Sequence, residues 1–413
     1  MLRRGTAPIG LLVGFLLILT LFALPGTTRA AGCDATTVRW ASSSNSLYVT
    51  GPVTCTLSEL QPLTKAPLTQ VDPAGKIWLL GANLRLEQGA TLQLHGSEVG
   101  GDVNELRLRS NNTSDATSTI FIRADWGNIS MRNTKVTSWD EAKNAPDTEY
   151  GTYKRSFIHV RSSLDADGVT PHQSRMDIVD SDVGYLGHAA AEAYGLTWKV
   201  SGVPGPFDKV DVLGDVTGSK IHHNYFGIYT YGAGAMKFLN NEINNNVQYG
   251  LDPHDDSDNL LIEGNYSHHN GNHGIICSKR CNNLTIRGNR SEYNTGHGIM
   301  LHRLVTDTVV ENNTVIGNSD AGIPIFDSSG NTVRGNTVSG NRYGIRLSVG
   351  ANNNLIENNT VSNNTASGFY FYKGSDAPTS GDGRPKFNRF VGNQVTGSKE
   401  YAIKLTDADD NSF

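Results

Sequence analysis

Apolar and polar positions alternate along most of this chain, and glycine and asparagine interrupt the alternation at regular intervals. The residues one and three places after these glycines are almost all apolar, as in Ile275/Cys277 and Ile299/Leu301. The glycines recur every 22 to 24 residues, at Gly227, Gly250, Gly274, Gly298, Gly322, Gly344 and Gly368. A period of two predicts strands, and a repeat of this length is typical of a solenoid.

Asparagines occupy two further fixed places in the repeat, nine and four residues before the glycine, as at Asn265 and Asn270. Asparagine tolerates left-handed backbone and can hydrogen-bond to the same residue one coil away, so both places are predicted to be stacked corners. We therefore expect an all-β fold, a single-stranded right-handed parallel β-helix with about 24 residues per coil. Its interior column is predicted to contain Leu251, Ile275, Ile299, Ile323 and Ile345.

The start of the chain has the residue pattern of an export signal. Arg3 and Arg4 precede an apolar run over 9–24, and small residues follow at 28 and 30. We predict a signal peptide over 1–30, an N-terminal cap over 31–75 and a catalytic β-helix domain over 76–413. The apolar run is short for a membrane span, so the mature chain is expected to be periplasmic or extracellular, with no membrane span.

Four cysteines in an exported chain suggest disulfide bonds. The simplest pairing joins Cys33 to Cys55 and Cys277 to Cys281. Cys277 also stands in an inward column, where a buried free thiol is the alternative. The cysteine spacing resembles no zinc site.

Three longer segments interrupt the repeat, over 139–154, 201–215 and 374–385. Loops that project from a regular scaffold tend to line its binding face. We expect these segments to border any functional surface.

The outward positions carry the candidate chemistry. Asp252 and His254 lie two apart in an extended segment, so they point to the same side and form a candidate acid/base pair. The same strip carries aromatic rings suited to sugar faces and cations suited to carboxylates. Its other members are Tyr229, Tyr231, Tyr249, Asp255, Lys279, Arg280, Arg303 and Arg346. The plainer interpretation is an exposed polar sheet face in which tyrosine is favoured by β-propensity.

Net charge limits the partners. The formal charge of −5 gives no general attraction to a polyanion, so we expect no nucleic-acid binding. An acidic substrate would have to be held locally, by the strip itself.

The run Tyr249-Gly-Leu-Asp-Pro-His-Asp255 resembles the periplasmic mannuronan C-5-epimerases of alginate biosynthesis. The resemblance extends over about 78–370. It includes His273-Gly-Ile-Ile, Ser278-Lys-Arg, Gly298-Ile-Met-Leu, Tyr185-Leu-Gly-His, Ala193-Tyr-Gly-Leu-Thr-Trp, Asn224-Tyr-Phe-Gly-Ile-Tyr-Thr-Tyr and Thr134-Lys-Val-Thr-Ser-Trp-Asp. The Asp-Pro-His-Asp motif is far more specific than the repeat, which unrelated sugar-binding β-helices share.

The resemblance implies polymer-level epimerisation of β-D-mannuronate to α-L-guluronate, in alginate or a related uronic acid polysaccharide. Such a site must neutralise the substrate carboxylate, remove the C5 proton from one face and return a proton to the other. His254 is the expected acid/base group, because an imidazole ordinarily titrates near neutral pH. Tyr249, its pKa lowered by a nearby cation, or a bound water would carry the second proton, and Asp252 would orient His254 or share a proton.

The remaining strip residues are assigned to the substrate. Arg280 is the first candidate to neutralise the carboxylate, followed by Lys279, Arg303 and Lys199. Alternation lets only one of Lys279 and Arg280 face the strip unless the strand ends there, and it turns Tyr249 inward unless the chain bends at Gly250. Further substrate contacts are expected from Asp255, Tyr229, Tyr231 and Arg346.

Two other functions stay open. A uronate polysaccharide lyase begins with the same proton abstraction, and a non-catalytic carbohydrate-binding periplasmic β-helix protein needs no acid/base pair. We expect a monomer with an anionic polysaccharide substrate, with the polysaccharide secretion machinery as a further partner. No cofactor is expected, although Asp252, Asp255, Asp256 and Asp258 are dense enough to bind calcium.

Overall fold

The computed structural model describes residues 31–110, 119–151 and 154–413, within one compact unit from Ala31 to Phe413. The predicted signal peptide over 1–30 lies outside the described residues. Within the described ranges, no helix has the length and apolar character needed to cross a membrane.

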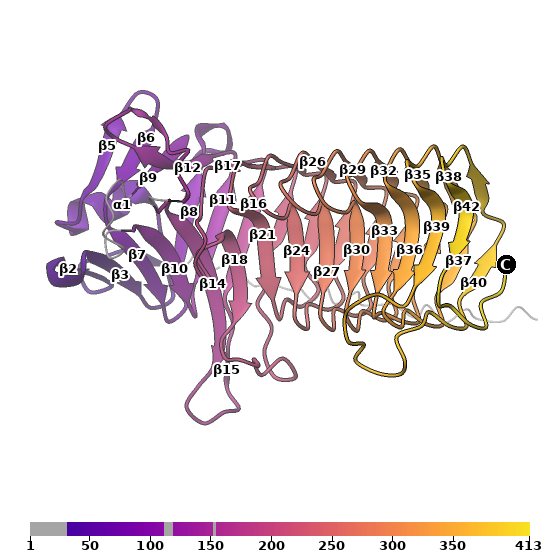
Figure 1. Ribbon diagram of the computed structural model, residues 1–413. Coiled ribbons are helices and arrows are strands. Elements are labelled where there is room, and N and C mark those ends of the chain that lie inside the picture. The colour runs from indigo at the N-terminus through magenta and orange to yellow at the C-terminus, as the bar shows by residue number, and fades with distance from the viewer. Residues whose placement is uncertain (1–30, 111–118, 152–153) are drawn as a thin grey trace, which may run out of the picture. The chain divides into compact units, whose positions relative to one another are not determined.

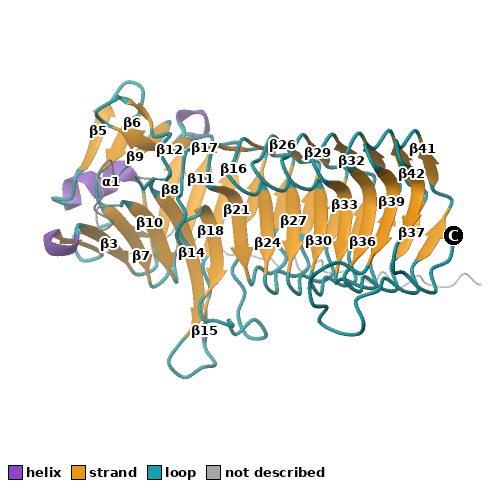
Figure 2. Cartoon of the chain, in the orientation of Figure 1, coloured by secondary structure: helices purple, strands orange, loops and turns teal. Residues whose placement is uncertain are grey.

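The chain winds as a parallel β-helix, and each complete coil adds one strand to each of three sheets (Figures 1 and 2). Among the described residues the three sheets contain 15, 13 and 14 strands. We call the 15-stranded sheet the site sheet, and the other two the second and third sheets. The predicted fold class, a right-handed parallel β-helix, is confirmed.

The site sheet comprises β2 (Val38–Ala41), β3 (Ser46–Thr50), β7 (Asn83–Glu87), β10 (Phe121–Asp125), β14 (Phe157–Leu164), β15 (Pro171–His172), β18 (Gly195–Val200), β21 (Phe226–Tyr231), β24 (Leu251–His254), β27 (Ile275–Ser278), β30 (Ile299–His302), β33 (Ala321–Phe326), β36 (Tyr343–Ser348), β39 (Ser367–Tyr372) and β42 (Tyr401–Leu405).

The second sheet comprises β1 (Ala31–Gly32), β4 (Val53–Cys55), β8 (Thr91–His95), β11 (Asn128–Arg132), β16 (Arg175–Val179), β19 (Asp215–Thr217), β22 (Lys237–Leu239), β25 (Leu261–Glu263), β28 (Thr285–Arg287), β31 (Val309–Glu311), β34 (Thr332–Arg334), β37 (Leu355–Glu357) and β40 (Arg389–Val391).

The third sheet comprises β5 (Leu68–Asp72), β6 (Ile77–Leu80), β9 (Glu105–Arg109), β12 (Lys135–Asp140), β13 (Ala145–Pro146), β17 (Asp182–Gly184), β20 (Lys220–His222), β23 (Glu242–Asn244), β26 (Tyr266–His268), β29 (Arg290–Glu292), β32 (Thr314–Ile316), β35 (Thr337–Ser339), β38 (Thr360–Ser362) and β41 (Gln394–Thr396). The helices are α1 (Leu57–Leu60) and the 3₁₀ turns Ser42–Ser44, Gln61–Leu63 and Ser97–Val99.

The core follows the predicted inward column. Leu251 pairs in register with Ile275, and Ile275 with Ile299. Ile323 and Ile345 continue the column, and all five side chains are fully buried. Each coil thus places one branched apolar side chain on the next, so neighbouring coils stabilise one another.

The predicted asparagine corners are confirmed. Asn265 donates a side-chain hydrogen bond to Asn289 at 2.9 Å, and Asn289 donates to Asn313 at 3.0 Å. A second ladder includes Asn270 and Asn294, joined at 2.9 Å. These amides are buried, and each also satisfies backbone groups at its corner, which fixes the spacing between coils.

The N-terminal end is closed by antiparallel pairs. β2 pairs with β3, and β5 pairs with β6, whereas β3 already pairs in parallel with β7. The cap segment therefore contributes strands to the sheets ahead of residue 76.

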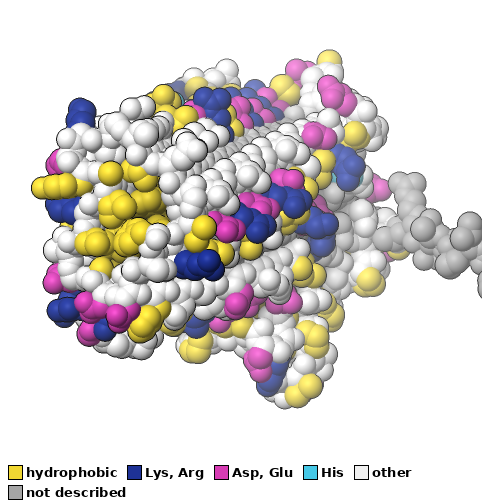
Figure 3. Space-filling model, turned by 90° about the vertical axis from the view of Figure 1, so that its right-hand side faces the viewer, with side chains coloured by type: hydrophobic (Ala, Val, Ile, Leu, Met, Phe, Trp, Pro, Cys, Tyr) yellow, Lys and Arg dark blue, Asp and Glu magenta, His cyan; other side chains and the backbone are white. Residues whose placement is uncertain are grey.

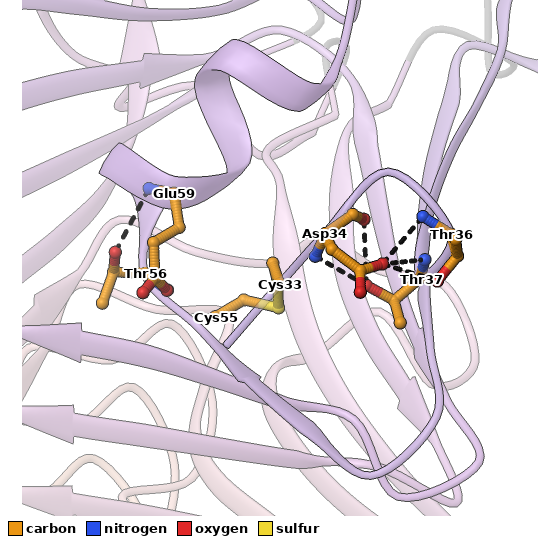
Figure 4. The surroundings of a disulfide bond; sticks show 7 residues. All are labelled: Cys33, Asp34, Thr36, Thr37, Cys55, Thr56 and Glu59. Atoms are coloured by element: carbon orange, nitrogen blue, oxygen red, sulfur yellow. Dashed lines mark hydrogen bonds between the residues drawn. A yellow bond between two sulfur atoms is a disulfide. The ribbon is translucent and has the colours of Figure 1, made fainter. Parts of the chain in front are cut away.

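Only one of the two predicted cysteine pairs forms. Cys33 and Cys55 are disulfide-bonded, with Thr56 capping α1 beside them (Figure 4). The pairing of Cys277 with Cys281 is wrong, because both are buried free thiols. Cys277 points into the core, while the Cys281 thiol donates to the carbonyl oxygen of Ser278 at 3.3 Å beyond the strand end.

The predicted excursions differ in where they lie. Phe207, in the second, packs on Tyr231 with ring centroids 5.0 Å apart. Asp376, in the third, pairs with Arg303 at 3.3 Å. The first begins on the third sheet, where β12 pairs with β13. A further projection that the repeat did not predict is the hairpin of β14 and β15 (Figure 1).

The last coil leaves apolar side chains uncovered on the C-terminal end face of this unit (Figure 3). Ile403, Leu405 and Phe413 are exposed there, beside the less exposed Phe390.

Candidate active site

The candidate acid/base pair lies on β24, in the middle of the site sheet. Asp252 pairs in register with Tyr229, and His254 pairs with Tyr231 on the preceding coil. Leu251 is fully buried in the core, while the His254 side chain keeps 21% of its surface exposed. Alternation along β24 therefore places Asp252 and His254 on the outer face, as predicted.

Asp252 is nevertheless buried, with only 2% of its surface exposed, and its Oδ1 atom has no hydrogen-bond partner among the described residues. Burial raises the pKa of this carboxyl to about 7. The Asp252 charge in turn contributes to the raised pKa values of Tyr194, Tyr229 and Tyr249. A carboxyl that titrates near neutral pH can hold or release a proton, which suits proton exchange.

The residue in contact with the imidazole is Asp255, one place further along the chain. Its Oδ2 atom lies 2.5 Å from His254 Nδ1, and its Oδ1 atom accepts from Arg280 Nη2 at 2.7 Å. Burial opposes the Asp255 charge, but the contacts with His254, Lys279 and Arg280 outweigh it and hold the pKa of this carboxyl below its ordinary value. Asp255, which the sequence assigned to the substrate, is thus the carboxylate in contact with His254, the place expected of Asp252.

Lys279 and Arg280 reach the same surface. β27 ends at Ser278, and the next two residues have left-handed backbone with φ of 63° and 59°. Strict alternation stops there, so both cations are available. Arg280 also donates to Asp256 at 2.8 Å, which raises the pKa of the guanidinium.

Two of the aspartates that are dense enough to bind calcium are paired with Arg280. Asp255 and Asp256 both pair with it, and Asp258 accepts from the backbone of Asn282 at 2.6 Å. Within the described part of the chain, no cluster of three or more His, Cys, Asp or Glu side chains is arranged to hold a metal ion.

Other predicted residues border the pair on the preceding coils. The Tyr229 ring lies 5.6 Å from the His254 ring. Lys199 Nζ lies 5.0 Å from the Tyr231 ring centre and forms an ion pair with Glu192.

Two predicted residues lie further along the coil axis. Arg303 is paired with Asp376. Arg346 pairs with Asp320 at 3.1 Å, on the fourth coil after His254.

Tyr249 lies just before β24, in a bend. A Cβ on Gly250 would come within 2.5 Å of the Gly274 carbonyl oxygen, so only glycine allows this close approach. The Tyr249 ring packs against Phe226 at 4.9 Å and His273 at 5.2 Å. Burial and the Asp252 charge raise the pKa of this phenol, so the expectation that a cation lowers it is wrong.

A cavity of about 360 Å³ opens beside Tyr249. Tyr194, Phe226 and Gln248 line it together with Ala189, Ala190, Ala191 and Tyr225. Tyr194 stacks on Phe226 at 4.5 Å, so the cavity offers an aromatic wall suited to a sugar ring.

A row of rings that the sequence pattern did not predict continues past Tyr249. His273 follows on the next coil, and the His273 and His297 rings stack at 4.6 Å. The signal was present, because the residue before the repeat glycine is aromatic or imidazole in four successive coils. Alternation assigned that position to the interior, and the bend at the glycine turns it outward.

The fold and site define a right-handed parallel β-helix protein with an acid, an imidazole and cations grouped on one face. A family model described as "Right handed beta helix region" matches residues 211–315, 256–382 and 305–413. The crystal structure of the periplasmic alginate epimerase AlgG superposes with a TM-score of 0.74 at 21% identity, covering 89% of this chain and 84% of that chain. At that identity the match shows the fold.

The curated relatives share one name, mannuronan C5-epimerase, which confirms the resemblance seen in the sequence. The Azotobacter vinelandii protein AlgG is 32% identical over 273 residues, 65% of this chain and 48% of that protein. The Pseudomonas putida protein is 29% identical over 264 residues, 63% of this chain and 48% of that protein. The chain thus spans about half the length of these relatives.

Proposed function

We propose that this chain epimerises C5 of β-D-mannuronate residues to α-L-guluronate within a polymer, alginate or a related uronic acid polysaccharide. The observation that carries the proposal is the contact chain His254–Asp255–Arg280 beside the buried Asp252. A sugar-binding surface needs neither a carboxyl with a pKa of about 7 nor an oriented imidazole. The likeness to proteins named mannuronan C5-epimerase supports the choice of reaction.

His254 acts on the C5 proton in this proposal. Asp255 at Nδ1 favours the tautomer with its proton on that nitrogen, which leaves the Nε2 lone pair to accept the C5 proton. Loss of that proton creates an enediolate-like dianion on the substrate. Lys279 and Arg280 supply the nearby positive charge that stabilises it.

Tyr249 supplies the second proton. Because burial and Asp252 raise the pKa of its phenol, the hydroxyl stays protonated and suits donation. A bound water is the alternative donor. Asp252 shares its proton within this cluster, as its pKa near neutral allows.

One experiment tests the reaction. Polymannuronate is incubated with the purified protein in deuterated water and followed by proton NMR. Deuterium at C5 together with guluronate signals and an unchanged chain length supports the epimerase. Chain cleavage with a new ultraviolet-absorbing unsaturated end indicates a lyase. Binding of the polymer without exchange indicates a carbohydrate-binding protein.

We also propose that the chain works in the periplasm as a monomer, after export by the 1–30 segment, and needs no cofactor. The periplasmic location named for the structural neighbour supports this compartment. The secretion machinery of the polysaccharide is the proposed further partner. Cell fractionation, ultracentrifugation and activity in the presence of a chelator test these points. Loss of activity with a chelator, restored by calcium, would support a calcium requirement instead.

A further inference from the structure

His273 and His297 form a ladder in which each ring is held by the next coil. His273 Nδ1 accepts from the backbone N–H of His297 at 3.0 Å, and His297 Nδ1 accepts from the N–H of Ala321 at 3.2 Å. Burial lowers the pKa of His273 to about 4 and that of His297 to about 2, so both rings are neutral at neutral pH. A neutral ring that accepts at Nδ1 carries its proton on Nε2.

The proton on Nε2 creates a conflict with Arg346. Arg346 Nη2 lies 3.2 Å from His297 Nε2, and a guanidinium has no acceptor. Two N–H groups therefore face each other. Asp320 accepts from Arg346 Nη1 at 3.1 Å, while Arg346 Nε is buried without a partner among the described residues.

Little of either side chain reaches the surface. About a tenth of the side chains of His297 and Arg346 is exposed, 9% and 11% respectively. A buried donor without an acceptor is unfavourable, and an anionic oxygen placed beside the two nitrogens, within hydrogen-bond distance of each, would satisfy both. Carboxylate oxygens are such acceptors, and a uronate polymer presents one carboxylate on every sugar.

We propose that His297 and Arg346 form a second carboxylate-binding subsite, which takes a uronate residue of the same polymer several sugars away from the one that reacts. This inference rests on the proposed function. Arg346 lies on the fourth coil after His254, and at about 4.8 Å per coil the two are roughly 19 Å apart along the axis. The rings of Tyr249, His273 and His297 follow one another on successive coils in the direction of Arg346.

Asp320 restricts what this subsite binds. Its charge compensates that of Arg346, so the subsite attracts small free anions weakly. A carboxylate tethered to a polymer that is already bound at His254 arrives at high effective concentration. The subsite should therefore favour long chains over short ones and make the enzyme sensitive to polymer length.

The variants His297→Asn and His297→Gln distinguish the hydrogen-bond roles of the two ring nitrogens, Nδ1 and Nε2. The asparagine amide can still accept from the Ala321 N–H but has no donor at the Nε2 position. The glutamine amide places a donor near Nε2 and gives up the Nδ1 acceptor. Arg346→Gln removes the charge, and Arg334→Gln on β34 of the second sheet is the matched charge control.

Calorimetric titration with oligomannuronates of increasing length measures the effect. In the wild type and in Arg334→Gln, affinity should step up at the length that first spans His254 and Arg346. His297→Asn and Arg346→Gln should lose about tenfold of that step and bind shorter oligomers as before, whereas His297→Gln should retain part of it. Carboxyl-reduced oligomers should show no step.

The contrary outcomes are distinct. A step that persists unchanged in His297→Asn and Arg346→Gln, or appears equally with carboxyl-reduced oligomers, overturns the subsite and leaves the proposed function intact. A wild-type protein that binds no uronate oligomer of any length overturns both. Melting curves of each variant verify that the fold is retained, and His297→Asn keeps the test available should Arg346→Gln fail to fold.

Discussion

Asp255 Oδ2 lies 2.5 Å from Nδ1 of His254, so Asp255, rather than Asp252, is the carboxylate in contact with the candidate catalytic imidazole. The same carboxylate is held from its other side by Arg280. Three side chains from two coils thus form one contact chain, with a charge order of cation, anion and imidazole. In the proposed reaction this arrangement would leave Nε2 as the reactive nitrogen and would stabilise the imidazolium that proton abstraction produces.

The first prediction is that Asp255→Asn lowers the rate of C5 exchange by about 10²-fold or more, because a neutral amide stabilises the imidazolium poorly and does not impose the tautomer. The fold should be retained, because the side chain lies on the outer face, and the melting temperature should fall only modestly with the loss of the pairs to Lys279 and Arg280. Asp256→Asn is the control, since Asp256 touches Arg280 but is not in contact with His254 Nδ1. Equal exchange rates in the two variants would contradict the orienting role.

The second prediction concerns the dependence of stability on pH through Asp252. Its pKa rises from an ordinary 3.8 to about 7 on folding, so the folded state binds the proton more tightly. Stability from this group is fully present below pH 3.8 and is lost as pH rises towards 7. Asp252→Asn removes this dependence.

Thermal melts at several pH values measure it. The melting temperature of the wild type, minus that of Asp252→Asn, should fall between pH 4 and pH 7. A difference that stays constant, or grows with pH, would show that Asp252 is charged throughout and cannot share a proton. The exchange rate of the variant should also lose part of its pH dependence.

The third prediction tests the core. Ile299→Asp should prevent folding or lower the melting temperature sharply, because a buried unpaired charge costs several kcal/mol. Ile299 lies between Ile275 and Ile323 with no exposed surface. Asn312→Asp, at an exposed corner, introduces the same charge and should leave the melt nearly unchanged. Soluble Ile299→Asp with a wild-type melting curve would mean that the register is wrong.

The sequence predicted the parts of this molecule that obey its repeat. Leu251 and Ile275 stack because period-two alternation and a fixed coil length leave no other register. The predictions failed where a strand ends. Cys281 lies past β27, and its distance from Cys277 along the chain did not reveal that both thiols stay free.

The residues of the candidate site that alternation placed wrongly also lie at strand ends. Tyr249 and the imidazoles of His273 and His297 precede their strands at bends next to glycines, so alternation assigned them to the wrong side. Asp255 has left-handed backbone with φ of 32°, which turns its carboxylate back to His254. Spacing along the chain favoured Asp252 as the partner of His254, and only the backbone geometry after β24 shows that Asp255 is in contact with it.

The fourth prediction concerns the cations. Replacing Lys279, Arg280 and Arg303 by glutamine should weaken binding of a uronate polymer and make the remaining binding less sensitive to salt, because fewer charge pairs are left to screen. The matched control combines Arg287→Gln, Arg334→Gln and Arg389→Gln, three exposed arginines of the second sheet. Affinity for long chains at low salt that is the same in both proteins would remove these cations from the substrate site.

The last prediction decides function. His254→Ala should abolish deuterium incorporation at C5, because it removes the group that accepts the proton. The fold should be retained, since the side chain lies on the outer face and Asp255 keeps its pair with Arg280. His269→Ala, beside β26 on the third sheet, is the control and should exchange at the wild-type rate. Tyr249→Phe keeps the ring contacts with Phe226 and His273 but removes the hydroxyl.

His254→Ala and Tyr249→Phe should lose different parts of the reaction, and that difference identifies the roles of the two residues. If Tyr249 returns the proton to the opposite face, Tyr249→Phe should still incorporate deuterium, through His254, while its yield of guluronate falls by about 10²-fold. If water returns the proton, guluronate should form in Tyr249→Phe at nearly the wild-type rate. Proton NMR in deuterated water reports exchange and inversion together. A His254→Ala protein that exchanges C5 as fast as the wild type would remove the catalytic assignment and leave a carbohydrate-binding β-helix as the better account of this chain.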